Sequence, residues 1–245
     1  MFSHEKLQVY AKALDFTAIA AAHTATWDKS HAFIDHLDRA AESVLCNLAE
    51  TARQTVTAAK LQTVDYAIDS ALECAGCLDI APIKGFLTDT QAYEEKQRLC
   101  EITKMLIGLR KAWAESVVRE EPVDYSAKSV GRPPERLFHH EGLEAYQAAL
   151  AFMEWFAAQP GAGELPSRLL RQVDEAGTGV VLNIAEGNGR YAKLDHHRFV
   201  QMAQTAAVKA AVSLDLSAKR EVWPSAETDV GKGKLRRISV LLGGF

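Results

Sequence analysis

The sequence predicts an all-α protein made of two tandem, up-and-down four-helix bundles joined by a proline-containing linker. Three observations predict this fold class. Apolar residues recur at the i, i+3, i+4, i+7 spacing of amphipathic helices, and no β-branched run alternates with polar residues between turn signals. The second half of the sequence also repeats the first. We expect residues 1–119 to form the first bundle, 120–138 the linker and 139–245 the second bundle.

The repeat is visible as matched segments at a constant separation. The segments that match 136 residues apart are 4–10 (HEKLQVY) with 140–146 (HEGLEAY), and Asn47–Glu50 with Asn183–Glu186. Lys60–Tyr66 matches Lys193–Phe199 at a separation of 133, which would make one loop of the second half three residues shorter. Agreement in order, spacing and chemistry predicts a tandem duplication.

Four amphipathic stretches account for the first half. Their apolar residues, spaced so that each helix buries one face, fall within Leu7–Ala18, Phe33–Leu48, Leu61–Leu78 and Leu99–Trp113. Turn-forming residues at 27–30, 55–57 and 82–88 separate them. Thr88 or Asp89 can cap the fourth helix, because a side-chain oxygen accepts a hydrogen bond from an unpaired backbone N–H.

The second half has the same four stretches with its own breaks. Pro160–Gly163 separates its first two helices, Gly187–Gly189 ends the second, and Trp223–Pro224 precedes the last. We expect the last helix to be short, because the chain stops at Phe245. One side of the second bundle would then be thinly covered and open to a partner.

Composition and charge limit the classes of function. A chain that is 48% hydrophobic and 24% charged is globular, and it contains neither a signal peptide nor the roughly 20 apolar residues of a membrane span. We therefore expect a cytoplasmic protein without membrane contact. The net charge of −4 means that nucleic-acid binding would need a local patch. The candidate patch consists of Lys219, Arg220, Lys232, Lys234, Arg236 and Arg237.

An Asn/Glu pair near the end of the second helix is the sharpest motif of each half. Its members are Asn47, Glu50, Asn183 and Glu186, and a separation of three puts each pair on one helix face. One interpretation is a polar network that fixes helix register, since buried amides and carboxylates need partners. The other is a ligand or catalytic role. One carboxylate per bundle is too few for a di-metal centre.

Cysteine and histidine pairs suggest metal, but their context does not. Cys74 and Cys77 have C-x-x-C spacing without a second pair or a neighbouring βαβ unit, so small buried hydrophobes are the first interpretation and metal binding the alternative. Four cysteines, all in the first half, do not form a disulfide framework. His139–His140 and His196–His197 are expected at helix ends on the surface. We expect no cofactor.

Arg190 and His196 form a second short pattern. An Arg-x4–6-His arrangement resembles the motif of the helical HEPN ribonucleases. In that resemblance the histidine acts as general acid or base and the arginine holds the phosphate. The first half lacks the pattern.

The helix motifs resemble those of the bacterial four-helix bundle proteins encoded in intervening sequences of 23S ribosomal RNA genes. The family pattern is Leu-x-x-Tyr in the first helix, Asn-Ile-Ala-Glu-Gly at the end of the second, and an aromatic residue in the third. The matching residues are Leu7, Tyr10, Asn47–Glu50 and Tyr66, then Leu143, Tyr146, Asn183–Gly187 and Phe199. The resemblance implies bundles that assemble into rings, often of five. Retroelement accessory variability proteins, which work with a reverse transcriptase and RNA, are similar but typically basic.

These observations favour a non-enzymatic interaction protein that self-associates, or binds a protein partner or RNA as an assembly scaffold. The alternative hypothesis is a HEPN-like ribonuclease that uses Arg190 and His196. A metal protein that uses Cys74 and Cys77 is a third.

Overall fold

The computed structural model describes residues 3–115, 136–163, 167–189 and 193–243. Over these residues the chain forms eight α-helices and two short 3-10 helices, His4–Lys6 and His139–Gly142, and no strand. The prediction of an all-α protein is confirmed. Among the same residues, no helix combines the length and the apolar character that a membrane crossing needs.

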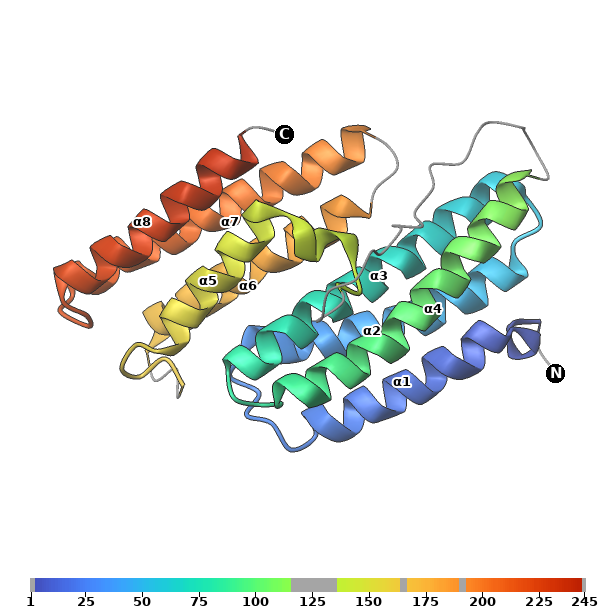
Figure 1. The fold of residues 1–245 in the computed structure, drawn as a ribbon, viewed down its shortest axis with the longest axis horizontal. Coiled ribbons are helices and arrows are strands. Elements are labelled where there is room, and N and C mark those ends of the chain that lie inside the picture. The colour runs from blue at the N-terminus through green and yellow to red at the C-terminus, as the bar shows by residue number, and fades with distance from the viewer. Residues whose placement is uncertain (1–2, 116–135, 164–166, 190–192, 244–245) are drawn as a thin grey trace.

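The first four helices pack against one another in a cycle. They are α1 (Gln8–Thr24), α2 (Ala32–Arg53), α3 (Thr57–Ile83) and α4 (Asp89–Glu115). Each helix contacts the next in the chain, and α4 returns to contact α1 (Figure 1). Fully buried side chains such as Phe33, Leu37, Leu99 and Leu106 fill the space between them. The apolar faces that the sequence places on these helices therefore meet in one core.

The last four helices pack in the same cyclic order. They are α5 (Glu144–Ala157), α6 (Arg168–Asn188), α7 (Lys193–Lys219) and α8 (Ser225–Leu242). Sequential neighbours are in contact, and α8 contacts α5. Tyr146, Phe152, Phe156 and Met153 are fully buried among them. Figure 1 shows α5–α8 as a group beside α1–α4, with α8 on the far side from α1.

Equivalent helices begin a constant distance apart in the chain. The first residues of the pairs α1/α5, α2/α6, α3/α7 and α4/α8 are 8/144, 32/168, 57/193 and 89/225, a difference of 136 each time. Tandem duplication of a bundle remains a prediction, which a superposition of 3–115 on 139–243 would test. We use the 136-residue separation below to name equivalent positions.

The third helix pair departs from the sequence alignment. The hydroxyls of Ser43 and Ser70 lie 2.8 Å apart between α2 and α3. At the equivalent place between α6 and α7, a Cβ on Gly179 would lie 3.6 Å from the Cβ of Ala206. These pairs are related by 136 residues, so the separation of 133 inferred from Lys60–Tyr66 is wrong for the packed helix.

The cap of α4 and the end of the linker are also defined. Thr88 Oγ1 accepts a hydrogen bond from the N–H of Gln91, and the Gln91 side chain accepts from the N–H of Thr88, which confirms the predicted cap. Residues 116–135, which include most of the predicted linker, lie outside the described residues. Phe138, at the end of that segment, is buried, and the carbonyl of Leu137 accepts a hydrogen bond from the Cys100 thiol at 3.4 Å.

Candidate interaction surfaces

The two groups of helices meet at a junction formed by α2 and α3 on one side and α5 and α6 on the other. The helices approach closely because glycine lies at the contact points. A Cβ on Gly76 of α3 would lie 2.8 Å from Leu182 Cδ2 on α6, and one on Gly189 would lie 2.2 Å from Leu72 Cδ1. The junction therefore depends on small residues opposite large ones.

A buried ion pair lies at one end of this junction. Lys84, directly after α3, pairs with Asp174 of α6, and their side chains are 2% and 1% exposed. The Ala32 N–H donates to Asp174 Oδ2 at 3.0 Å, and the Lys84 ammonium lies 4.6 Å from the centre of the Phe156 ring. Burial lowers the pKa of Lys84, while the Asp174 carboxylate opposes that change. The pair joins the two halves by charge as well as by packing.

A second charged cluster lies farther along the junction. The Lys96 ammonium of α4 is 2.5 Å from Asp79 Oδ1 and 2.7 Å from Glu141 Oε1. The Tyr146 hydroxyl of α5 donates to Asp79 Oδ2 at 2.7 Å. Burial alone would lower the pKa of Lys96, but the two carboxylates raise it above the usual value. The cluster therefore holds a charged lysine between carboxylates from both halves.

His140 lies beside this cluster and is completely buried. Its ring packs against Phe138 and Tyr146, with centroids at 5.6 and 4.7 Å, and neither ring nitrogen has a hydrogen-bond partner among the described residues. Burial lowers its pKa to about 3, so the ring is neutral at physiological pH. The expectation that this histidine lies on the surface is wrong, because the 3-10 turn before α5 inserts it into the junction.

Asp79, His140 and Glu141 each offer a ligand atom, and these atoms lie within 4.8 Å of one another. Such a trio has the donor chemistry of a divalent-cation site. The Lys96 ammonium already forms ion pairs with the Asp79 and Glu141 carboxylates and supplies the positive charge that a metal ion would bring. The arrangement is therefore explained as an ion-pair cluster, and we do not assign a metal to it.

A groove of about 890 Å³ runs along α6 and α7, and His36 of α2 also lines it. Small or polar residues line its α6 side, and four apolar side chains of α7 are exposed along it: Val208 (60%), Val212 (51%), Met202 (43%) and Leu216 (39%). The lining positions 202, 205, 209, 212 and 216 alternate in steps of three and four. This spacing is typical of a helix face that packs against another helix.

The equivalent face of the first half is covered. It is the α2–α3 face, and α6 contacts both of those helices at the junction. The α1–α2 face of the first half, in contrast, carries an open hollow of about 270 Å³ that Lys29, Asp38 and Glu42 line together with small residues. Its equivalent in the second half, the α5–α6 face, is covered by α3. Each half therefore leaves open the face that the other half uses.

The predicted Asn/Glu motif is partly buried, but its bonds stay mostly within one helix. Asn47 donates to the Ser43 carbonyl at 2.9 Å, and Asn183 donates to the Gly179 carbonyl at 2.6 Å. Glu50 pairs with Arg53 of the same helix. The Asn47 network reaches α3 indirectly, because the Ser43 hydroxyl meets Ser70 and the Thr51 hydroxyl, which donates to the Asn47 carbonyl, meets Thr63. The prediction that these residues bond directly to neighbouring helices is wrong for Asn47, Glu50 and Asn183.

The C-x-x-C cysteines are buried within α3. Cys74 and Cys77 are free thiols, and burial raises the pKa of both well above the usual value, so they stay protonated. A protonated, buried thiol is a poor metal ligand and a poor nucleophile. Neither belongs to a cluster of possible metal ligands among the described residues. Cys46, in contrast, is exposed on α2.

The predicted ribonuclease pair cannot be placed as a pair. Arg190 lies outside the described residues. His196, near the start of α7, has its Nδ1 atom 2.7 Å from the carbonyl oxygen of Gly187. This contact ties the histidine to the end of α6, where it bridges two helices of the bundle.

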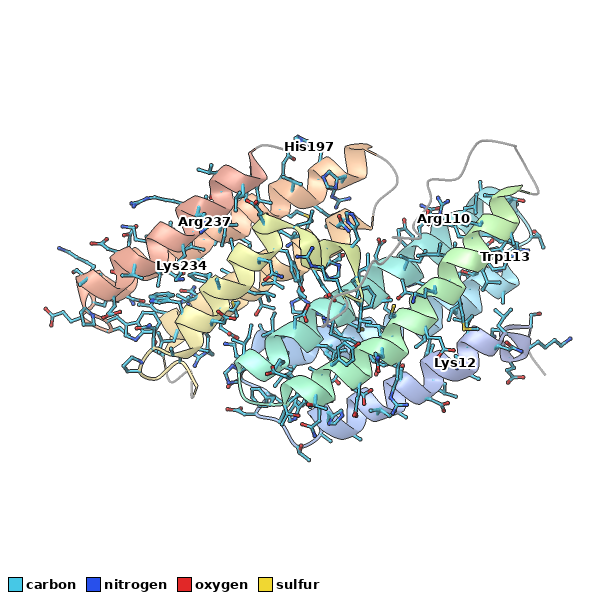
Figure 2. All side chains as sticks on the ribbon, viewed as in Figure 1. Lys12, Arg110, Trp113, His197, Lys234 and Arg237 are labelled. Carbon is cyan, nitrogen blue, oxygen red and sulfur yellow. The ribbon has the colours of Figure 1, made fainter. Side chains whose placement is uncertain are left out.

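The predicted basic patch is spread over the end of α7 and along α8. Figure 2 shows Lys234 and Arg237 on α8, on the opposite side of the molecule from Lys12 on α1. Lys232 is already paired with Asp215 at 2.5 Å and lies 3.8 Å from Asp229. Lys219, Arg220, Arg236 and Arg237 are exposed and Lys234 is half-buried. Acidic neighbours thus reduce the positive field of this surface.

Comparison with known proteins finds a family match for the first half. Residues 5–108 match the family model described as 23S rRNA-intervening sequence protein. This part of the chain is similar to that family. The match to the 23S rRNA-intervening sequence protein family confirms the resemblance for the first half, where it spans α1, α2, α3 and most of α4, including Tyr10 and Asn47–Glu50. The resemblance of the second half stays a prediction. No curated protein and no solved structure matches the chain.

Proposed function

We propose that this protein is a non-enzymatic helical scaffold that binds a helical part of a protein partner in the α6–α7 groove. The observation that supports this most directly is the exposed stripe of Met202, Val208, Val212 and Leu216 within one groove. Isolated exposed apolar residues are common, but a contiguous set in a concave surface is typical of an interaction site. Burying an amphipathic helix there would remove this stripe from water.

Within the chain itself, a helix already packs on the face equivalent to the groove. The α2–α3 face, which is equivalent to the groove, receives α6 at the junction. A helix-sized ligand therefore suits this kind of face in this protein. Burial of the four apolar side chains would contribute at about 25 cal/mol per Å² of apolar area removed from water.

A protein partner is favoured over RNA by the charge of the groove. Arg198 and Lys209 line it, but so does Glu175, and most of the other lining residues are small, apolar or uncharged polar ones. RNA recognition by phosphate contact needs several unneutralised cations close together. Lys232, in the predicted basic patch, is neutralised by Asp215. RNA binding is therefore the weaker interpretation for this groove.

Among the described residues, several side chains that could do chemistry have structural partners, which fits the proposed scaffold. Cys74 and Cys77 are protonated in the core, and His196 is tied to the Gly187 carbonyl. The Lys96 cluster is an ion-pair network within the junction.

Site-specific photo-crosslinking in cells that express the full chain tests the proposal. A benzophenone amino acid at position 208 lies in the groove, and the same group at Val240 of α8, which is 76% exposed and does not line the groove, is the matched control. We expect a discrete protein adduct from position 208 and none from position 240. Adducts that disappear on nuclease treatment would instead assign the groove to RNA. Equal labelling from both positions would refute a dedicated groove.

A further inference from the structure

Three exposed cations form a row along the groove face of α7. They are Arg198, Lys209 and Arg220, eleven residues apart each time. Eleven residues make close to three turns of an α-helix, so the three positions share nearly the same face, about 16 Å apart. Arg220 directly follows α7, and its N–H still donates to the Leu216 carbonyl at 2.9 Å, as within a helix. The row therefore runs along the groove from one end to one turn beyond Leu216.

Between the cations, the same face carries apolar side chains and one threonine. Read in steps of three or four residues, the face is Arg198, Met202, Thr205, Lys209, Val212, Leu216 and Arg220. A helix that packs there would meet a cation at every third turn and mostly apolar side chains in between. A partner without charges would bury these cations uncompensated, which is unfavourable.

The row has little counter-charge of its own. Among the residues that the structure describes, none of the three cations forms an ion pair. Glu175 is the only carboxylate among the described residues that line the groove. Contacts at Gly179 and Gly187 show that α6 runs antiparallel to α7, so Glu175 lies toward the opposite end of the groove from Arg198. The groove is therefore cationic as well as apolar.

The junction shows how a helix docks on the equivalent face of the first half. Three contacts between α3 and α6 define this docking: Lys84 with Asp174, Gly76 with Leu182, and Leu72 with Gly189. Residue numbers fall along α3 as they rise along α6, so the two helices run antiparallel. The docked helix thus brings a carboxylate, in its second turn, to the lysine that follows α3.

The equivalent positions on α7 are Arg220, Val212 and Val208, and all three are exposed. Arg220 keeps the positive charge that meets Asp174 at the junction. Val212 is larger than the glycine at the equivalent position and Val208 is smaller than the leucine. A helix docked here in the same way therefore needs a small residue at Val212 and can place a larger one at Val208.

The other two cations distinguish the groove from its equivalent. Arg198 and Lys209 correspond to Gln62 and Glu73 of α3. In the first half, Glu73 pairs with His36 of α2 at 2.6 Å. The groove therefore has two more cations and one carboxylate fewer than the face that receives α6, and it suits a helix that is more acidic than α6.

We propose that the helix bound in the groove is an acidic amphipathic helix of a partner protein. It lies antiparallel to α7 and presents carboxylates, about eleven residues apart, to Arg198, Lys209 and Arg220. The two arginines hold carboxylates by paired hydrogen bonds. Apolar side chains of the partner cover the exposed stripe between these contacts. This inference rests on the proposed function, because it names the chemistry of the partner of the same groove.

The spacing of the row favours carboxylates on a helix over phosphates on RNA. A partner helix has the same rise per residue as α7, so carboxylates at every eleventh position match the cations in register. Phosphates along a nucleic-acid strand follow one another much more closely than about 16 Å. The apolar stripe between the cations also offers nothing that a phosphate would bind.

Binding of synthetic peptides to the full chain tests this inference. The acidic probe is a fluorescein-labelled helical peptide of about 26 residues, with leucines and three glutamates on one face, the glutamates eleven residues apart. A second probe has glutamine in place of glutamate, and a third carries the glutamates on the opposite face. In fluorescence anisotropy, we expect the acidic probe to bind at least about tenfold more tightly than either of the others.

Variants of the chain assign the preference to the row. The preference should disappear in Arg198→Gln/Lys209→Gln/Arg220→Gln. It should persist in the matched control, which removes three exposed cations outside the groove: Lys104→Gln/Arg236→Gln/Arg237→Gln. Circular dichroism should show the same helical signal for both variants, because all six side chains are exposed.

Several results would overturn the acidic partner. They are equal binding of all three probes, failure of the acidic probe to bind, and a preference that survives in the groove variant. In cells, a position-208 adduct that contains two copies of this chain, or that nuclease removes, would do the same. Equal binding of the probes would still leave an apolar docking groove, and a position-208 adduct with another protein would then support the proposed function without its acidic partner.

Discussion

Replacing Lys84 with methionine should strongly destabilise the folded chain. Methionine keeps most of the length of the side chain, so the main change is the loss of the ammonium group. Asp174, which is 1% exposed, would keep one hydrogen bond, from the Ala32 N–H, and would lose its counter-charge. Removing one member of a buried ion pair typically costs about 3–5 kcal/mol, because the remaining charge is left uncompensated.

Urea denaturation, followed by circular dichroism and by tryptophan fluorescence, measures this free energy. Arg39→Ala is the matched control, because its ion pair with Asp35 is exposed (61% and 71%) and should contribute only about 0.3–0.5 kcal/mol. Lys84→Met/Asp174→Leu should be less destabilised than the sum of the single changes, since it leaves no buried charge. The reasoning would be refuted if Lys84→Met lost no more stability than Arg39→Ala.

Three further outcomes follow from the junction and the core. Burial lowers the pKa of His140 from 6.5 to about 3, so the unfolded chain takes up the proton first and stability falls as the pH drops below 6.5. Relative to His140→Leu, the protein should lose about 2 kcal/mol of unfolding free energy between pH 7 and pH 5. Urea titrations at both pH values measure this loss, and His197→Leu is the control. Gly76→Ala should lower the melting temperature because the added Cβ would meet Leu182. Gly108→Ala is the control: its Cβ would have no neighbour within 4 Å, so the change should raise stability by up to about 1 kcal/mol. Equal shifts in melting temperature would contradict the close approach of the helices at Gly76. In dilute native protein one thiol, Cys46, should react rapidly with Ellman's reagent, and fast reaction of the other three would show that they are not buried.

Helix positions were predictable because each helix buries an apolar face against neighbouring helices. The stripes of Phe33–Leu48 and Leu99–Trp113 have the spacing of that face, and both became α-helices with buried cores. The separation of 133 in the third pair failed for a physical reason. The alignment rested largely on matching one aromatic residue, Tyr66, with another, Phe199. A shift of three residues along a helix leaves a side chain on nearly the same face, so spacing did not reveal the error.

The interaction surfaces were much less predictable. On α7 the buried stripe Val200, Ala203, Ala207, Ala210 and Leu214 lies next to the exposed stripe of Met202 to Leu216, and both have helical spacing. Sequence spacing alone does not say which stripe faces the core. His140 was placed on the surface because a polar residue before a helix is usually exposed. Its burial depends on the packing of the second half against the first, where Lys96 pairs with the neighbouring Glu141.

The ion pairs of the junction have a fixed polarity, since the lysines belong to the first half and Asp174 and Glu141 to the second. Each half produced alone would therefore carry an unmatched charge on the surface that it normally buries. Two separately encoded polypeptides, 1–119 and 136–245, should have little tendency to pair with themselves through this surface and should recombine with each other. The arrangement makes the protein suitable for reconstitution from fragments, with recovery of helical signal on mixing as the measure of recognition.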